Sequence, residues 1–191
     1  MKLNRSVLLA FGLLILAASL YRVWDGRPLG FAPQIAMAIF GGAIIKNKKL
    51  AFILPLLSMF ISDAIYQVLY INGYTTIQGF YEGQWQNYLL FGLLTTIGFL
   101  IKKVNVLNVF AASVAAPTVY FILSNFIVWA GWQGTRGLGR PKTFDGLMMS
   151  YTDALPFYPN SIYSTLIFSA IFFGGYYLVK KYILRSKHQL A

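Results

Sequence analysis

Cysteine is absent from this 191-residue sequence, histidine occurs once, and only five residues are acidic. Without cysteine, disulfides and thiolate metal sites are excluded. The single histidine, His188, lies in the charged C-terminal tail. A histidine-based metal site or a Ser-His-Asp triad inside a membrane is therefore excluded as well. Five acidic residues are also too few to cover a soluble domain of this length, since such domains are about one quarter charged.

Apolar residues fill the composition instead. Hydrophobic residues make up 58% of the chain and charged residues 11%, so the surplus apolar surface is expected to face lipid. The formal net charge of +11 could indicate nucleic-acid binding. However, the basic residues fall in short clusters between apolar runs. We therefore predict the lipid bilayer as a partner and no nucleic acid.

The apolar runs predict an all-α integral membrane protein. A helix of about 20 apolar residues crosses a hydrocarbon core of roughly 30 Å. We predict a single transmembrane domain over residues 1–191 that folds as a six-helix bundle. Its spans are Ser6–Tyr21, Phe31–Ile45, Leu50–Ile71, Gln86–Ile101, Val106–Ala130 and Ser161–Val179. The second run is short and could be re-entrant, but the charges that bracket it favour a full span.

The positive-inside rule predicts the orientation. With six spans, one side carries eleven basic residues: Lys2, Arg5, Lys46, Lys48, Lys49, Lys102, Lys103, Lys180, Lys181, Arg185 and Lys187. The other side carries five: Arg22, Arg27, Arg136, Arg140 and Lys142. Both termini are thus expected in the cytoplasm. The first segment also resembles a signal peptide ending near Ala17-Ala18-Ser19; we favour a retained helix, and cleavage would leave five spans.

The longest stretch outside the spans, residues 131–160, is expected on the outer side. Its first part, residues 131–141, is too rich in glycine for a helix. Thr143 can cap a short helix that reaches about Asp153. Phe144, Leu147, Met148 and Tyr151 would form its apolar face. We expect this helix at the membrane interface or over the outer end of the bundle.

Polar residues gather near the same outer side and predict a ligand pocket. Asp63 is the only acid in a predicted span and lies thirteen residues after Leu50, roughly 20 Å deep. Ionisable residues inside membranes often mark function. The predicted ligand-binding residues are Asp63, Asn125, Trp129, Arg27, Tyr66 and Trp132. The alternatives are that Asp63 only pairs with Arg27 or Asn125, and that the aromatic residues form an interfacial belt.

No enzyme motif is present. The sequence lacks a phosphate-binding glycine loop, HExxH, a serine elbow and a close carboxylate pair within a span. We predict no catalytic residue, cofactor or metal, although a lipid-acting enzyme using Asp63 and Asp153 is a further alternative. Small residues recur at Ala32/Ala36, Ala38/Gly42 and Gly174 with Gly175. They permit close helix contacts, and against a partner helix they would suit an accessory subunit of a larger complex.

Several segments resemble a small bacterial integral membrane-protein family of unknown function. They are Phe31–Ala43, Ser124–Trp129, Pro141–Thr143, Ala154–Phe157 and the Ser58…Ser62-Asp63 pattern, and together they span most of the chain from Arg27 to Phe168. That family is similar to the S components of energy-coupling factor (ECF) vitamin transporters.

The resemblance implies six helices, cytoplasmic termini in the bacterial plasma membrane, and a vitamin or precursor bound from outside. It also implies a membrane T component and a pair of ATPases as partners. S components often carry Ala-x-x-x-Ala on their first helix for docking the T component. Here Ala32 and Ala36 begin the second predicted helix instead.

Overall fold

The protein is a bundle of α-helices. The structure, a computed structural model, describes residues 5–131 and 137–189, and these ranges contain no β-strand. The elements are α1 (Arg5–Val23), α2 (Gln34–Ile44), α3 (Lys48–Ala51), α4 (Ile53–Ile71), α5 (Gln84–Phe99), α6 (Val106–Ala130), α7 (Phe144–Ala154), the 3-10 turn η1 (Leu155–Phe157) and α8 (Tyr158–Gln189). Each of the six apolar runs contains a helix. The short helix expected after Thr143 is present as α7, and Thr143 accepts a hydrogen bond from the Gly146 amide at 3.2 Å.

Three helical stretches of the described chain are long and apolar enough to cross a membrane. They are Lys48–Ile71, Val106–Ala130 and Phe144–Lys181, with 24, 25 and 38 residues. The apolar helices Leu9–Val23 and Gln34–Ile44 are shorter. These lengths indicate a membrane protein.

The 11-residue helix α2 occupies the centre of the bundle. It packs against α4, α5, α6 and α8. Ala36, Met37, Ala38 and Ile39 have no exposed surface. Its 11 residues rise only about 17 Å, roughly half of a hydrocarbon core. Helix α2 is therefore too short to cross a bilayer as a helix alone, which differs from the full helical span favoured by the sequence.

The chain before α2 is non-helical and is held by the start of α8. Residues 24–33 are not helical, yet Pro33 is fully buried. Asn160 donates a hydrogen bond to the Leu29 carbonyl at 2.9 Å, and Ser161 donates one to the Gly30 carbonyl at 3.2 Å. Non-helical backbone is tolerated at membrane depth only where protein supplies its partners. The start of α8 supplies partners to these two carbonyls.

Two glycines bring α2 and α5 into backbone contact. A Cβ atom on Gly98 would lie 2.3 Å from the Ile39 carbonyl oxygen, and one on Gly42 would lie 2.3 Å from the Thr95 carbonyl oxygen. The two glycines also face each other, since either added Cβ would lie 2.9 Å from the other glycine's Cα. Only glycine permits this approach. The pairing fixes α5 against the central helix.

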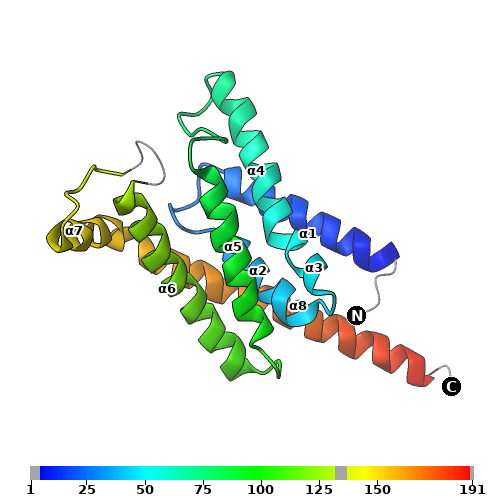
Figure 1. Cartoon of the computed structure of the whole chain (residues 1–191). Coiled ribbons are helices and arrows are strands. Elements are labelled where there is room, and N and C mark those ends of the chain that lie inside the picture. Colours follow the sequence, from blue (N-terminus) through cyan, green and yellow to red (C-terminus); the bar gives the residue numbers. More distant parts are fainter. Residues whose placement is uncertain (1–4, 132–136, 190–191) are drawn as a thin grey trace.

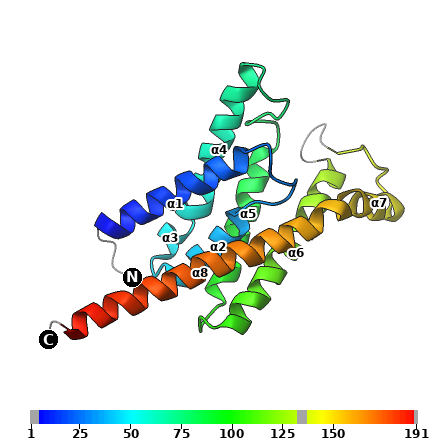
Figure 2. The ribbon, with the colours of Figure 1, turned by 180° about the vertical axis from the view of Figure 1, so that it is seen from behind.

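The bundle has a lysine end and an acidic half. Figures 1 and 2 show the start of α1, the α2–α3 and α5–α6 connections and the end of α8 toward one end, and the α1–α2 loop, the α4–α5 loop and α7 toward the other. The first end carries Lys46, Lys48, Lys49, Lys102, Lys103, Lys180 and Lys181, which define the lysine end. All five acids of the chain, Asp25, Asp63, Glu82, Asp145 and Asp153, belong to the opposite, acidic half. This separation follows the alternation on which the predicted orientation rests.

We expect Gly98→Ala to destabilise the protein by about 1–3 kcal/mol, because the new methyl group meets a backbone carbonyl that cannot move cheaply. Thermal unfolding of the purified protein in detergent measures the loss. Gly92→Ala on the same helix is the matched control, since an added Cβ there meets nothing within 4 Å. That variant should be unchanged or slightly more stable, as alanine favours helix over glycine. Equal melting temperatures for the two variants would show that the glycine contact is not needed.

Candidate functional site

Asp63 on α4 is the centre of a buried polar network. Its side chain is 2% exposed and forms an ion pair with Arg22, in the last turn of α1. Two side chains of α5 also reach it: Gln84 Nε2 donates to Oδ2 at 2.6 Å and the Tyr88 hydroxyl donates to the same oxygen at 2.8 Å. The carboxylate thereby joins three helices, α1, α4 and α5.

Arg22 takes part through both its side chain and its backbone. Its guanidinium also donates to the Ser62 hydroxyl at 2.5 Å. The Arg22 carbonyl accepts hydrogen bonds from the Tyr66 hydroxyl at 2.8 Å and from Arg27 Nε at 2.5 Å. Carbonyls at a helix C-terminus have no partner within the helix. Tyr66 and Arg27 therefore cap α1, and the seven residues Arg22, Arg27, Ser62, Asp63, Tyr66, Gln84 and Tyr88 form what we call the Asp63 network.

The Asp63 carboxylate has little capacity left for another partner. A carboxylate offers about four acceptor positions, and Arg22, Gln84 and Tyr88 occupy three. A buried charge needs such partners, because leaving it unpaired in an apolar interior costs several kcal/mol. The arrangement is therefore suited to holding helices together. Ligand binding by Asp63 stays a prediction of the sequence.

A separate pocket of about 400 Å³ lies between α5, α6 and the segment around α7. Its lining mixes aromatic, amide and hydroxyl side chains: Tyr81, Asn87, Tyr120, Ser124, Asn125, Val128, Gly137, Leu138, Ser150, Asp153, Ala154 and Phe157. Small-molecule sites typically measure about 300 to 1,000 Å³ and combine apolar walls with a few polar groups. This pocket matches that description in size and chemistry.

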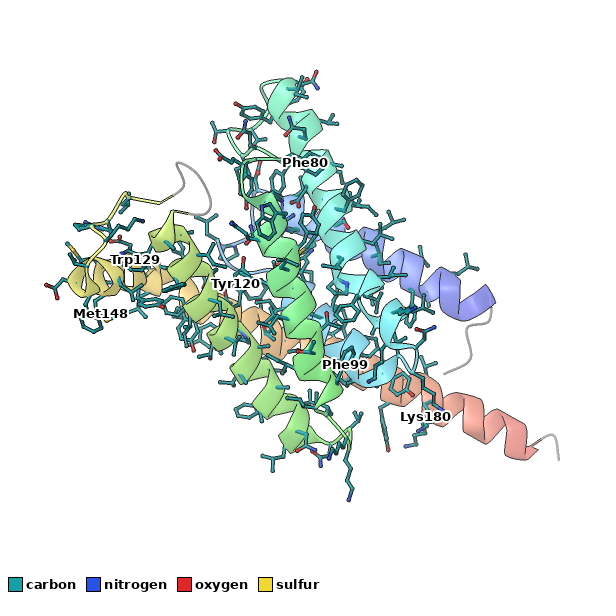
Figure 3. All side chains as sticks on the ribbon, viewed as in Figure 1. Phe80, Phe99, Tyr120, Trp129, Met148 and Lys180 are labelled. Carbon is teal, nitrogen blue, oxygen red and sulfur yellow. The ribbon has the colours of Figure 1, made fainter. Side chains whose placement is uncertain are left out.

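Hydrogen bonds hold the polar lining in place. Asn87 donates to the Tyr81 hydroxyl, and the Tyr120 hydroxyl donates to Asn87 Oδ1 at 3.4 Å. The Tyr120 ring packs on Phe91 of α5 with ring centroids 5.3 Å apart, and Figure 3 shows Tyr120 between α6 and α5. Asn125 donates its amide to the Phe121 carbonyl at 2.7 Å. Both asparagines are thus oriented before any ligand arrives.

Residues 137–154 line one side of the pocket. Hydrogen bonds hold this segment against α6, and an ion pair links two of its own residues. Arg140 makes two hydrogen bonds to the Asp153 carboxylate, at 2.8 and 2.7 Å, and these raise the pKa of Arg140 above its ordinary value. Trp129 Nε1 donates to the Pro141 carbonyl at 2.8 Å, and the Lys142 ammonium donates to the Trp129 carbonyl. Asp153 is the one acid that lines the pocket.

The structure divides the residues predicted to bind a ligand between two places. Asp63, Tyr66 and Arg27 belong to the Asp63 network, whereas Asn125 lines the pocket. Trp129 holds the covering segment through Pro141 and Lys142, and Trp132 lies outside the described residues.

The partners named for Asp63 in the structural alternative, Arg27 and Asn125, were wrong. Its cation is Arg22, whereas Arg27 donates to the Tyr66 hydroxyl at 3.3 Å and to the Arg22 carbonyl. Asn125 bonds within α6 instead of reaching Asp63.

Helix α5 forms the wall between the network and the pocket. Gln84 and Tyr88, one turn apart, point to Asp63, and Asn87 lines the pocket. Sequence reasoning missed Gln84 and Asn87 as site residues and treated Arg22 only as an outer charge. The spacing of Gln84 and Tyr88, which places both on one helix face, was the available signal.

Other ligand chemistry was sought in the described ranges. Within residues 5–131 and 137–189, no group of three or more His, Asp or Glu side chains is placed to hold a metal ion. Two buried amide oxygens, Gln34 Oε1 and Gln84 Oε1, have no hydrogen-bond partner among the described residues. Buried oxygens of this kind are commonly satisfied by internal water.

Comparison with known proteins gives one match. A family model described as "Family of unknown function (DUF6580)" matches residues 2–188. No curated protein and no solved structure matches the chain. The match covers nearly the whole chain.

We expect Asp63→Asn to lower the free energy of unfolding by about 3 kcal/mol, because it leaves the partly buried Arg22 guanidinium without its counter-charge. Chemical or thermal unfolding in detergent measures the effect. Asp153→Asn is the matched control: both partners of that ion pair are about 30% exposed, and exposed ion pairs contribute little to stability.

The double variant Arg22→Gln with Asp63→Asn should recover part of the lost stability, since no unpaired charge remains. If Asp63→Asn and Asp153→Asn destabilise the protein equally, the Asp63 network does not hold the helices together.

Proposed function

The chain belongs to this family of unknown function (DUF6580), and from its own geometry we propose that it binds a small molecule within the membrane. The proposed role is a nutrient-binding or transport protein similar to the S component of an ECF transporter. A vitamin or a vitamin precursor is the proposed ligand class. The protein acts, on this proposal, as a binder and not as an enzyme.

The pocket between α5, α6 and α7 is the observation that carries this proposal. Its volume of about 400 Å³ suits a ligand of vitamin size. Three aromatic side chains, Tyr81, Tyr120 and Phe157, offer faces on which a planar ring can stack. The asparagines Asn87 and Asn125 supply amide groups that can fix its orientation.

The proposed orientation brings the ligand in from outside the cell. The pocket lies in the acidic half, opposite the lysine end. Basic residues concentrate on the cytoplasmic side of membrane proteins. This charge separation supports six crossings with both termini in the cytoplasm of a bacterial cell, with α2 and the non-helical residues before it making one crossing together.

Energy coupling through a T component and ATPases is a separate part of the proposal. The Ala-x-x-x-Ala pair that S components use for docking corresponds here to Ala32 and Ala36. Ala36 is fully buried in the centre of the bundle, so this pair cannot form the docking surface. Coupling to an ECF module would need another lipid-facing helix, and the binding function does not depend on it.

The alternative is an accessory subunit of a larger membrane complex, with small residues at its partner interface. Gly42 packs on Gly98 inside the protein, and Ala36 and Ala38 are fully buried. Among the small-residue pairs singled out in the sequence, Gly174 and Gly175 on α8 are exposed, and a Cβ at either would meet nothing within 4 Å. That face is where the alternative would place its partner.

Native mass spectrometry of the gently purified protein tests the two functions. We expect a reproducible bound small molecule, and we expect Asn125→Ala to weaken its retention by about three- to tenfold, the effect of losing one or two hydrogen bonds. Asn108→Ala is the matched control, since Asn108 lies on the same helix at the opposite end and bonds the Lys103 carbonyl. Retention should be normal in that variant.

An empty protein that carries a stoichiometric membrane partner would favour the accessory subunit. A bound small molecule retained equally by both asparagine variants would remove the pocket from the binding function.

A further inference from the structure

Five lysines on two neighbouring connections form a basic surface at the lysine end. We propose that this surface binds the headgroup of an anionic phospholipid. Lys46, Lys48 and Lys49 lie at the α2–α3 connection and in α3, and Lys102 and Lys103 lie at the α5–α6 connection. All five are exposed. This inference is independent of the proposed function of the pocket.

In the part of the chain that the structure describes, no aspartate or glutamate forms an ion pair with these lysines. The five acids all belong to the acidic half, and in the described ranges the two ion pairs, Arg22–Asp63 and Arg140–Asp153, lie there as well. Five cations held near one another repel unless an external anion compensates them. The protein therefore needs a counter-charge from its surroundings at this end.

An aromatic contact joins the two connections. The Lys48 ammonium lies over the Phe99 ring, 4.0 Å from its centroid, and Phe99 packs edge-on against Phe52 with centroids 5.6 Å apart. Phe99 is the last residue of α5, so Lys48 of α3 sits beside the turn that carries Lys102 and Lys103. This contact brings the two lysine-bearing connections next to each other.

Asparagine caps hold both segments in fixed conformations. Asn47 Oδ1 accepts from the Lys49 and Leu50 amides at 3.1 and 3.4 Å, and Asn105 Oδ1 accepts from the Asn108 amide at 2.8 Å. Asn108 in turn donates to the Lys103 carbonyl at 2.9 Å. The backbone of the basic surface is thus ordered before binding, which lowers the entropy cost of binding.

Exposed apolar side chains border the lysines and select a lipid over a soluble anion. Leu100, Val104, Val106 and Leu107 are 76%, 48%, 88% and 73% exposed. They flank Lys102 and Lys103 on both sides in the sequence. Apolar side chains beside a cationic surface suit a ligand that combines a phosphate headgroup with acyl chains. Soluble phosphates would use the lysines and leave this apolar border exposed.

Lipid titration followed by native mass spectrometry tests the site. The protein in detergent is titrated with phosphatidylglycerol or with phosphatidylcholine of the same acyl chains. We expect tighter binding of phosphatidylglycerol, and we expect the double substitution K102Q/K103Q to weaken it about 25-fold. Each basic residue near an anionic headgroup contributes about 1 kcal/mol, which is roughly a fivefold change in affinity.

Two further variants separate a defined site from a general positive charge. K102R/K103R keeps both charges and should bind as tightly as the native protein. K180Q/K181Q removes the same charge from α8, outside the two connections, and should change affinity by less than twofold.

Three results would overturn the proposal. One is equal binding of the two lipids by the native protein, and another is equal weakening by the two glutamine pairs. The third is displacement of phosphatidylglycerol by millimolar inorganic phosphate, which would assign the surface to soluble anions.

Discussion

A polar group that leaves water for hydrocarbon must form its hydrogen bonds within the protein. Many contacts between the helices of this bundle meet that requirement. The Arg22–Asp63 ion pair is the most demanding case, because two opposite charges meet inside the bundle. Gln84, Tyr88 and Ser62 complete its hydrogen bonds, and Tyr66 and Arg27 satisfy the carbonyl at the end of α1. The requirement of one carboxylate thereby sets the relative positions of α1, α4 and α5.

The position of α5 then determines the shape of the pocket. Gln84 and Tyr88 fasten its first turns to Asp63, and Gly98 fixes its other end against α2. Asn87 lies in the same first turns of α5 and lines the pocket. The buried network therefore acts on the proposed binding site as a support, without touching what the pocket holds. For this reason the polar residues that the sequence grouped together are divided between the Asp63 network and the pocket.

Much of the fold could be read from the sequence because hydrophobic runs and caps are local signals. The six apolar runs each contain a helix, and Thr143 marks the start of α7. The length of α2 could not be predicted, since the non-helical segment before it is held by hydrogen bonds from Asn160 and Ser161, far away in the chain. The cation that pairs with Asp63 could not be predicted from the sequence either. Arg22 and Arg27 are both plausible cations by sequence, and only the packing of α1 on α4 decides between them. Asn125 was predicted as a site residue because a polar residue in an apolar helix is conspicuous. Asn87 was not, because it sits near a helix start, where polar residues are ordinary.

The hydrogen bonds from the start of α8 to the α1–α2 loop also bear on the order in which the protein is made. Asn160 and Leu29 are separated by 131 residues, so the loop is synthesised long before its partner. During that interval the carbonyls of Leu29 and Gly30 have no donor from α8, and the short helix α2 lacks one of its packing surfaces. The early half of the chain is consequently incomplete until its final helix arrives. The central helix α2 is the second helix to be synthesised, but its packing is completed only when α8 has been made.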